Sequence, residues 1–254
     1  TELPMVIINV QRGGPSTGLP TKTEQSDLNQ AFYGRNGEAP MPIIAPSTPG
    51  DCFLAAYEAC KIAIKYMTPV FYLSDGYLAN GSEPWKIPNI KDLDPIEVKF
   101  SDKPNEGDSF LPYKRDDKTL SRPWALPGTP GLEHRLGGIE KEENTGHVNY
   151  DPDNHHRMTE LRKEKIARVA SDIGKTKIYG DSKGDLLILG WGGTYGACRS
   201  SAETLREENY NVSHAQLRWI NPFPSDLKII LSNFEHVLIP EINMGQLIKL
   251  IRSE

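Results

Sequence analysis

The chain has 254 residues and a formal net charge of −5, with a sequence pI near 5.7. This length allows one large or two ordinary domains, and we expect two. The acidic balance argues against a nucleic-acid scaffold, which needs clustered Lys and Arg facing phosphates. No apolar run reaches the roughly 18 residues that span a bilayer, and no signal peptide precedes the first strand. We therefore expect a cytoplasmic protein that binds neither a membrane nor a nucleic acid.

The first predicted element is a buried strand over residues 5–10, whose exit loop covers residues 11–28 (loop 11–28). The glycines and prolines of this loop exclude a helix or a sheet ladder. Arg12 stands at the carboxyl end of the strand, where open α/β sheets keep their ligand crevices. Its guanidinium can hold a carboxylate or phosphate through two parallel hydrogen bonds, and Thr21 could add a neutral donor. A purely structural loop with a solvated arginine fits the same composition.

Loop 11–28 is not a Walker A loop. Only three residues separate Gly14 from Gly18, where that motif has four. The pair Leu19-Pro20 also stands where Gly-Lys-Ser/Thr would have to follow. An anion held here would therefore be bound in another way than a nucleotide in a P-loop.

Two more buried parallel strands are predicted at residues 42–46 and 69–73. The helix between them ends near Tyr66, and we expect Thr48 to cap it with Pro49 in its first position. Apolar residues at helical spacing place one side of this helix against a sheet. Strand, helix and strand thus form a βαβ unit.

The carboxyl ends of parallel strands share one rim of a sheet. We therefore expect one crevice to be within reach of four side chains from three loops: Arg12, Ser47, Thr48 and Asp75. For Asp75, a role as a turn cap is favoured over a contact with a ligand.

A long connector is predicted after these strands, because residues 83–130 are rich in proline and charge. Its aromatic side chains should lie on a surface, of this chain or of a partner. Asp151, Asp153, His155 and His156 then invite a metal-site interpretation. Their spacing fits neither His-Glu-x-x-His nor an EF-hand, so a turn that caps a helix at 157–171 is preferred.

A second alternating unit begins at Gly184, with strands at 185–190, 212–220 and 237–240 and helices at 197–209 and 225–233. This alternation predicts a small doubly wound α/β fold, and a last helix starts after Gly245. The first turn of the unit, residues 190–196 (turn 190–196), is similar to a dinucleotide fingerprint. Tyr195 replaces its third glycine, and no acid follows the next strand to hold a ribose. We interpret it as a structural turn and keep a nucleotide-binding module as an alternative.

Loop 11–28 reads Gln-Arg-Gly-Gly-Pro-Ser-Thr-Gly-Leu-Pro-Thr-Lys-Thr-Glu-Gln-Ser-Asp-Leu and resembles the signature loop of the α subunit of 2-oxoacid:ferredoxin oxidoreductases, above all the 2-oxoglutarate enzymes. Similar family segments recur over nearly the whole chain, at residues 74–79, 131–135, 150–155 and 221–224.

The resemblance implies an α/β fold in three parts. Residues 1–95 match the second half of a thiamine-diphosphate pyrimidine-binding parallel-sheet domain, and residues 175–254 match most of a transketolase-C-terminal-like α/β domain. Residues 96–174 form a Pro-rich connector and linking helix. The family's upstream Tyr-Pro-Ile-Thr-Pro segment and cofactor-activating glutamate are absent, so the chain looks like a fragment that lacks its N-terminal part.

The implied activity is oxidative decarboxylation of 2-oxoglutarate to succinyl-CoA with reduction of ferredoxin. Arg12 and Thr21 correspond to the family's loop residues that bind the 2-oxoacid carboxylate. The complete enzyme would use thiamine diphosphate with Mg²⁺, a [4Fe–4S] cluster and coenzyme A as co-substrate, mainly through its β subunit. Three scattered cysteines cannot hold such a cluster here. We expect no cofactor in this chain alone, and no activity without the β subunit.

The implied partners are the β subunit, ferredoxin as the electron acceptor, and a second α subunit. The same chemistry on pyruvate or branched-chain 2-oxoacids stays open, because Arg12 can hold the 1-carboxylate that all 2-oxoacids share. Lys22 is only a weak candidate for a distal carboxylate. A non-catalytic docking or structural subunit is the alternative from a different class, in which the aromatic connector would carry the partner.

Overall fold

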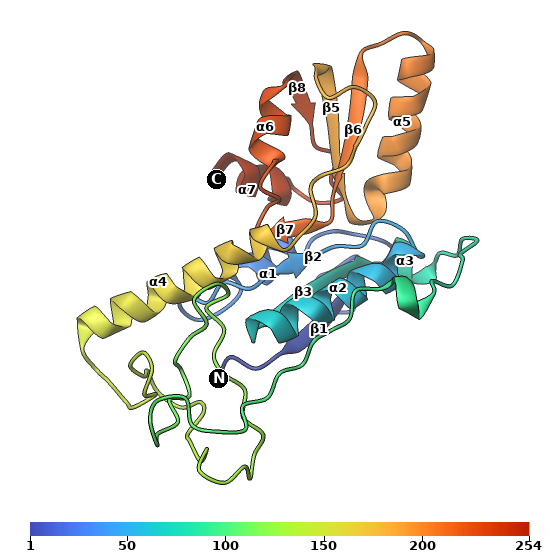
Figure 1. Ribbon diagram of the computed structural model, residues 1–254. Coiled ribbons are helices and arrows are strands. Elements are labelled where there is room, and N and C mark those ends of the chain that lie inside the picture. Colours follow the sequence, from blue (N-terminus) through green and yellow to red (C-terminus); the bar gives the residue numbers. More distant parts are fainter. Residues whose placement is uncertain (254) are drawn as a thin grey trace.

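The computed structural model describes residues 1–253, which form two α/β units, a long connector and a long helix that lies across them (Figure 1). The first unit contains a four-stranded sheet with the strand order β1-β3-β2-β7. Its strands are β1 (Met5–Gln11), β3 (Pro69–Asp75), β2 (Ile43–Ile44) and β7 (Trp219–Asn221). The first three strands are parallel and β7 is antiparallel to β2. The parallel strands at the start of the chain are thereby confirmed.

The helix α2 (Asp51–Tyr66) covers one face of this sheet, because its buried positions Ala55, Ala59 and Ile62 pack on Val70 and Tyr72 of β3. Its predicted cap is present, since the hydroxyl oxygen of Thr48 accepts a hydrogen bond from the backbone N–H of Asp51 at 3.1 Å. The helix begins at Asp51, two residues after the predicted Pro49. Two short helices complete the unit, α1 (Leu28–Tyr33) and α3 (Gly76–Asn80).

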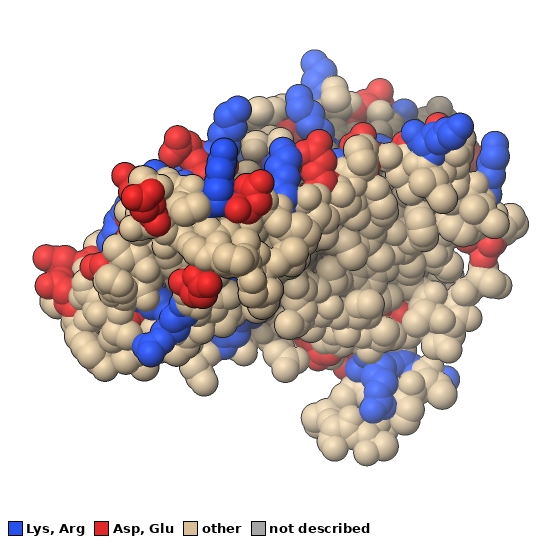
Figure 2. All heavy atoms as spheres, turned by 60° about the horizontal axis from the view of Figure 1, so that its bottom comes forward, with Lys and Arg blue, Asp and Glu red and all other residues tan. Residues whose placement is uncertain are grey.

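The strand β1 is an edge strand, and the prediction that it is buried is wrong. Met5, Ile8 and Val10 are 56, 64 and 46 % exposed. Within residues 1–253, β1 pairs with β3 alone. An apolar run does not distinguish a covered strand from an edge strand, because both carry β-branched residues. Figure 2 shows that the underside of the molecule as drawn in Figure 1 has a wide area without Lys, Arg, Asp or Glu.

The second unit has the strand order β4-β6-β5-β8, with β5 (Gly184–Trp191), β6 (Val212–Leu217) and β8 (Phe234–Leu238) parallel and the short β4 (Ile178–Tyr179) antiparallel. The helix α5 (Tyr195–Glu207) lies on one side of the sheet, and α6 (Leu227–Ser232) and α7 (Gln246–Ser253) lie on the other (Figure 1). A one-turn 3-10 helix, η3 (Gly192–Thr194), precedes α5. This arrangement confirms the predicted doubly wound unit.

The predicted strand at 212–220 is in fact two strands that belong to different sheets. It divides at Arg218, whose guanidinium pairs with Asp51 at 2.9 Å and with Glu58 at 2.9 Å, both on α2. β6 ends in the second sheet and β7 continues in the first. The sequence pattern is apolar on both sides of Arg218, so it gives no sign of the break. One apolar core extends through both units and includes Leu73 and Trp191.

The connector, residues 81–151, contains one short 3-10 helix, η1 (Ile90–Asp92), and otherwise only isolated bridges, as predicted. The helix α4 (Pro152–Arg168) follows it and continues into the 3-10 helix η2 (Val169–Ser171). α4 starts five residues before the predicted 157, because Asp151 caps it and Pro152 occupies its first position. Of the helices formed by residues 1–253, none is long and apolar enough to cross a membrane.

Candidate functional site

Loop 11–28 leaves the carboxyl end of β1 as a compact, cross-linked turn. The backbone N–H of Gly13 donates to the carbonyl of Lys22 at 2.7 Å, and the N–H of Leu19 donates to the carbonyl of Gly13 at 2.8 Å. Gly18 has φ +45°, and a Cβ there would lie 2.2 Å from the Gly13 carbonyl oxygen. A side chain at this position is therefore excluded for two reasons: the positive φ disfavours it, and its Cβ would overlap the Gly13 carbonyl.

A buried polar network anchors the base of the loop. Gln11, which is 1 % exposed, donates to the carbonyl of Ser74 at 3.2 Å and accepts from the N–H of Asp27 at 3.1 Å. Asn9 donates to the carboxylate of Asp27 at 3.0 Å. The two ends of the loop are thus tied to each other and to β3, and they fix where Arg12 leaves the sheet.

Arg12 lies beside this anchored base and Thr21 lies on the exposed part of the loop. The Nη1 atom of Arg12 donates to the carbonyl of Thr17 at 2.6 Å. Its Nε and Nη2 atoms, and the hydroxyl of Thr21, have no hydrogen-bond partner within residues 1–253. The guanidinium is half-buried, held on one side by its own loop. The side formed by Nε and Nη2 is the edge that arginine uses for bidentate pairing with a carboxylate.

The other residues expected at the rim are held by protein groups. The amide and hydroxyl groups of Ser47 donate to the carboxylate of Asp51 at 2.9 and 3.0 Å. The hydroxyl of Thr48 donates to Glu83 at 2.6 Å. These two residues therefore complete the start of α2 and do not form a ligand crevice with Arg12. The local reason is that Asp51, the first residue of α2, lies three and four residues after Thr48 and Ser47 and can reach back to them.

Asp75 is the predicted cap and has a second contact that the sequence did not suggest. Its Oδ1 atom accepts from the N–H groups of Tyr77 and Leu78 at 3.0 and 3.1 Å, at the start of α3. Its Oδ2 atom accepts from the N–H of Gly193 at 2.7 Å, in the second unit. The side chain is fully buried. Asp75 thus joins the two units and leaves no lone pair facing an open crevice.

Gln25 of loop 11–28 makes a second set of contacts with the same turn. It is fully buried, and its side chain donates to the carbonyl of Trp191 at 2.7 Å and accepts from the N–H of Ile242 at 3.1 Å. Gly192 has φ +55°, and a Cβ there would lie 2.7 Å from Nε2 of Gln25. A Cβ on Gly193 would lie 2.6 Å from the carboxylate of Asp75. The glycines of turn 190–196 therefore serve close packing against the first unit.

Two side chains near turn 190–196 are buried and titratable. His214 on β6 is 2 % exposed, and its ring lies 5.6 Å from that of Tyr195. Burial lowers the pKa of His214, the neighbouring Gln216 side chain opposes this in part, and the charge of Arg199 adds to it. Burial raises the pKa of Cys198 in the same region. The raised pKa keeps Cys198 as a thiol at neutral pH, which is the unreactive form of a cysteine.

Sequence reasoning missed Gln11, Gln25 and the second contact of Asp75. A signal existed for Gln11 and Asn9, because amides inside an apolar strand need buried partners. Nothing in the local pattern distinguishes Gln25 from its solvated neighbours, since its partners lie more than 160 residues away.

Two family models match the chain. Residues 1–151 match "Pyruvate flavodoxin/ferredoxin oxidoreductase, thiamine diP-bdg", and residues 184–254 match "Pyruvate:ferredoxin oxidoreductase core domain II". A solved structure of a 2-oxoglutarate:ferredoxin oxidoreductase from Magnetococcus marinus, with 2-oxoglutarate, coenzyme A and succinyl-CoA bound, is 34 % identical and superposes with a TM-score of 0.90. The match covers 100 % of this chain and 44 % of that one.

Curated relatives agree with these matches. The 2-oxoglutarate oxidoreductase subunit KorA of Mycobacterium tuberculosis is 50 % identical over 100 % of this chain and 38 % of its own length. The α subunit of 2-oxoacid:ferredoxin oxidoreductase 1 of Aeropyrum pernix is 32 % identical over 100 % of this chain and 40 % of its length. The chain thus spans about two fifths of the length of these relatives.

Proposed function

The chain belongs to the family of pyruvate flavodoxin/ferredoxin oxidoreductases with a thiamine diphosphate-binding domain, and from this premise we propose that it is part of the α subunit of a 2-oxoglutarate:ferredoxin oxidoreductase. The proposed reaction is the oxidative decarboxylation of 2-oxoglutarate to succinyl-CoA with reduction of ferredoxin. The relative from Mycobacterium tuberculosis and the structure from Magnetococcus marinus both carry 2-oxoglutarate in their names or titles, which supports this substrate over pyruvate.

The proposed task of this chain is to hold the 1-carboxylate of the 2-oxoacid. The observation that carries it is the state of Arg12: Nη1 is engaged by the loop at 2.6 Å, and the Nε–Nη2 edge has no partner within residues 1–253. An arginine fixed on one side loses less side-chain freedom when it binds a ligand on the other. Thr21 on the same loop is the proposed neutral donor to the same oxygens.

The thiamine diphosphate, its Mg²⁺ and the [4Fe–4S] cluster are proposed for the assembled enzyme. Among residues 1–253, no group of three or more His, Cys, Asp or Glu side chains is arranged to hold a metal ion. Asp75 and Thr48, the polar residues at the strand ends, are engaged by protein groups. The residues present therefore do not fit a diphosphate–metal site, and the role proposed for this chain does not use its own carboxylates.

The proposed partners are a β subunit, a second α subunit, and ferredoxin as the electron acceptor. The exposed apolar edge of β1 supports contact with another part of the enzyme, because long apolar edge strands are normally covered or charged. Met5, Ile8 and Val10 would be buried by such a contact. We also propose that the chain has no decarboxylase activity by itself. Turnover of 2-oxoglutarate by the purified chain with thiamine diphosphate and no second subunit would contradict this.

The test of the proposed function is Arg12→Ala in the assembled enzyme. Loss of a charge-assisted bidentate contact should lower kcat/KM for 2-oxoglutarate by about 2 to 4 kcal/mol equivalent, with a raised KM. Lys183→Ala, which removes an exposed cation far along the sequence, is the charge control and should leave both constants unchanged. Unaltered constants in Arg12→Ala would reject the carboxylate role.

Lys22→Ala distinguishes the substrates, because only 2-oxoglutarate carries a distal carboxylate. If Lys22 pairs with that group, the variant should raise KM for 2-oxoglutarate and leave KM for pyruvate unchanged. Equal KM values in wild type and variant would remove Lys22 from the site.

A further inference from the structure

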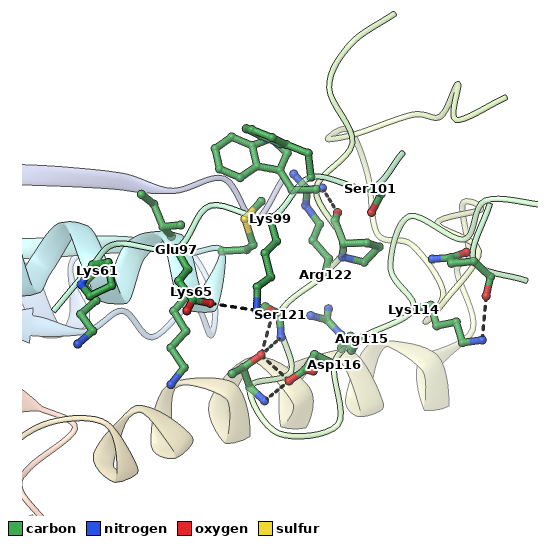
Figure 3. Close-up of a pocket in the computed structure, with 18 of the residues that line it drawn as sticks. Lys61, Lys65, Glu97, Lys99, Ser101, Lys114, Arg115, Asp116, Ser121 and Arg122 are labelled. Carbon is green, nitrogen blue, oxygen red and sulfur yellow. Dashed lines mark hydrogen bonds and ion pairs between the residues drawn. The ribbon is translucent and has the colours of Figure 1, made fainter. Parts of the chain in front are cut away.

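Figure 3 shows a cleft of about 830 Å³. It lies near the start of β3, at the opposite end of the first sheet from loop 11–28. It is lined by Met67 just before β3 and by residues of α2 and the connector. β1 has seven residues, so the cleft and Arg12 are separated by about 20 Å along that strand. This cleft, here called the basic cleft, is therefore distinct from the proposed carboxylate site.

Two buried arginines, Arg115 and Arg122, form the floor of the basic cleft (Figure 3). Arg122 is 2 % exposed, and its Nε and Nη1 atoms donate only to backbone carbonyls, at 2.9 to 3.0 Å. Its Nη2 atom is buried and has no partner within residues 1–253. The side chain of Arg115 is 4 % exposed, and its Nε atom is likewise unpaired. A buried guanidinium N–H without an acceptor costs folding free energy. An additional acceptor at either arginine would therefore be stabilising.

The floor also carries more positive than negative charge. Glu2 pairs with Arg115 and, at 2.7 Å, with Lys165, which also donates to the carbonyl of Met67 at 3.0 Å. Arg122 has no carboxylate partner among residues 1–253. Arg115 and Lys165 thus share the carboxylate of Glu2. Asp116 also lines the cleft, so the positive charges exceed the negative ones by one. Burial lowers the pKa of Lys165 to about 8, with the charge of Glu2 opposing this and those of Arg115 and Arg122 adding to it.

The charges around the mouth of the cleft, in contrast, are balanced. Each lysine there has an acid within ion-pair distance: Lys61 with Asp94, Lys65 with Asp172, Lys99 with Glu97 and Lys114 with Glu106. The unmatched charge therefore lies at the bottom of the cleft, where solvent screens it least. A bound anion would be held there more strongly than at the surface.

An aromatic wall stands beside this floor. Phe100 and Trp124 both line the cleft, and their rings meet edge to face with centroids 4.9 Å apart. Phe100 is 44 % exposed, so part of its ring face is available to a ligand. Aromatic faces of this kind stack on heterocyclic bases.

We propose that the basic cleft binds a nucleoside phosphate, with its phosphate against Arg115 and Arg122 and its base against Phe100 and Trp124. A phosphate carries a charge of about −1.5 to −2 at neutral pH, which is opposite in sign to the excess charge of the floor. The volume of the cleft lies within the roughly 300–1,000 Å³ of small-molecule sites. The site is independent of the proposed 2-oxoacid chemistry.

The test is a calorimetric titration of the chain with ADP, inorganic pyrophosphate and adenosine. We expect saturable one-to-one binding of ADP that weakens with added salt. Phe100→Ala should weaken ADP at least about fivefold and leave pyrophosphate unchanged, because only the base meets the aromatic wall. Arg122→Gln should weaken both at least about tenfold. Coenzyme A carries the same adenosine diphosphate group as ADP. The tighter binder of the two identifies which molecule supplies the nucleoside phosphate to the cleft.

The controls separate a site from general charge attraction. Lys183→Ala removes an exposed cation outside the cleft and should leave ADP binding unchanged. Circular dichroism shows whether Arg122→Gln folds. If it does not, the proposal is still tested by Phe100→Ala, which should weaken the binding of ADP and leave the binding of pyrophosphate unchanged. The proposal is overturned if ADP gives only heat of dilution at millimolar concentration, if Lys183→Ala weakens ADP as much as Phe100→Ala does, or if Phe100→Ala leaves ADP unchanged.

Discussion

Loop 11–28 follows β1 of the first unit and turn 190–196 follows β5 of the second, and these two glycine-rich segments are used in opposite ways. Loop 11–28 keeps the Nε–Nη2 edge of Arg12 without a protein partner within residues 1–253. Turn 190–196 offers the N–H of Gly193 at a position where related turns bind phosphate, but the carboxylate of Asp75 already accepts it at 2.7 Å. A glycine-rich turn is thus a ligand site only when the same chain does not fill it.

The difference also separates the two candidate functions that the sequence left open. A dinucleotide at turn 190–196 would have to displace Asp75 and Gln25, which are both fully buried and together join the units. No such displacement is needed at Arg12. The structural interpretation of the turn is therefore supported by what occupies it, and four variants test the contrast.

Asp75→Ala should have the largest effect. It leaves the N–H groups of Tyr77, Leu78 and Gly193 without their acceptor in a buried place. We expect the free energy of unfolding to fall by about 2 to 4 kcal/mol. Chemical denaturation measures this, with Asp75→Asn as a milder control that keeps one oxygen. A loss below about 1 kcal/mol would mean that the clamp between the units is not a main source of stability.

Gly193→Ala should be the next largest. Its Cβ would lie 2.6 Å from the Asp75 carboxylate, so the turn and the first unit must move apart. We expect a loss of about 1 to 3 kcal/mol in the free energy of unfolding. Gly196→Ala, three residues later in α5, has no heavy atom within 4 Å of the added Cβ and should stabilise the helix slightly. Equal effects of the two variants would remove close packing as the reason for the glycine.

The pH dependence of stability between pH 7 and pH 5 should be a smaller effect, to which His214 contributes. The folded pKa of His214 is lowered by burial, so the unfolded chain takes up its proton first as the pH falls through about 6.5. Stability should therefore decline between pH 7 and pH 5, and His214→Gln should flatten the decline in denaturation curves. His236→Gln, at an exposed position, controls for the loss of a histidine. A decline that is unchanged in His214→Gln would assign it to other groups.

Arg12→Ala should have the smallest effect on stability, less than about 0.5 kcal/mol, because its single hydrogen bond is to an exposed part of its own loop. The same variant should have a large effect on turnover in the assembled enzyme. Thermal denaturation of the variant checks the first statement. A large drop in melting temperature would mean that Arg12 shapes the loop, and the kinetic result would then need a conservative Arg12→Lys variant beside it.

The sequence was sufficient for elements whose determinants are local. The βαβ unit from 42 to 75, the cap by Asp75 and the strand-helix alternation after Gly184 follow from apolar spacing and capping residues, and the structure contains them. The start of α4 was placed five residues late, although Asp151-Pro152 is itself a helix-start signal. An Asp-Pro pair starts turns as well as helices, so the local pattern does not separate the two.

Long-range features could not be predicted in the same way. The partners of Gln25 and the Gly193 contact of Asp75 are more than 100 residues distant, and tertiary packing alone decides them. The exposure of β1 and the burial of Arg122 depend on which elements cover them, which a pattern of residue types does not specify. The roles of Arg12 and Thr21 stay predictions, because they depend on a ligand.

The break at Arg218 gives one continuous segment to two sheets, since β6 lies in the second and β7 closes the edge of the first. Any rotation of one unit against the other would have to break the pairing of β7 with β2. The two units should therefore unfold in a single cooperative step. A fragment that starts at Gly184 would contain β7 and would leave β2 of the first unit without this partner. A cut within the connector would separate the same two strands, because β2 precedes the connector and β7 follows it.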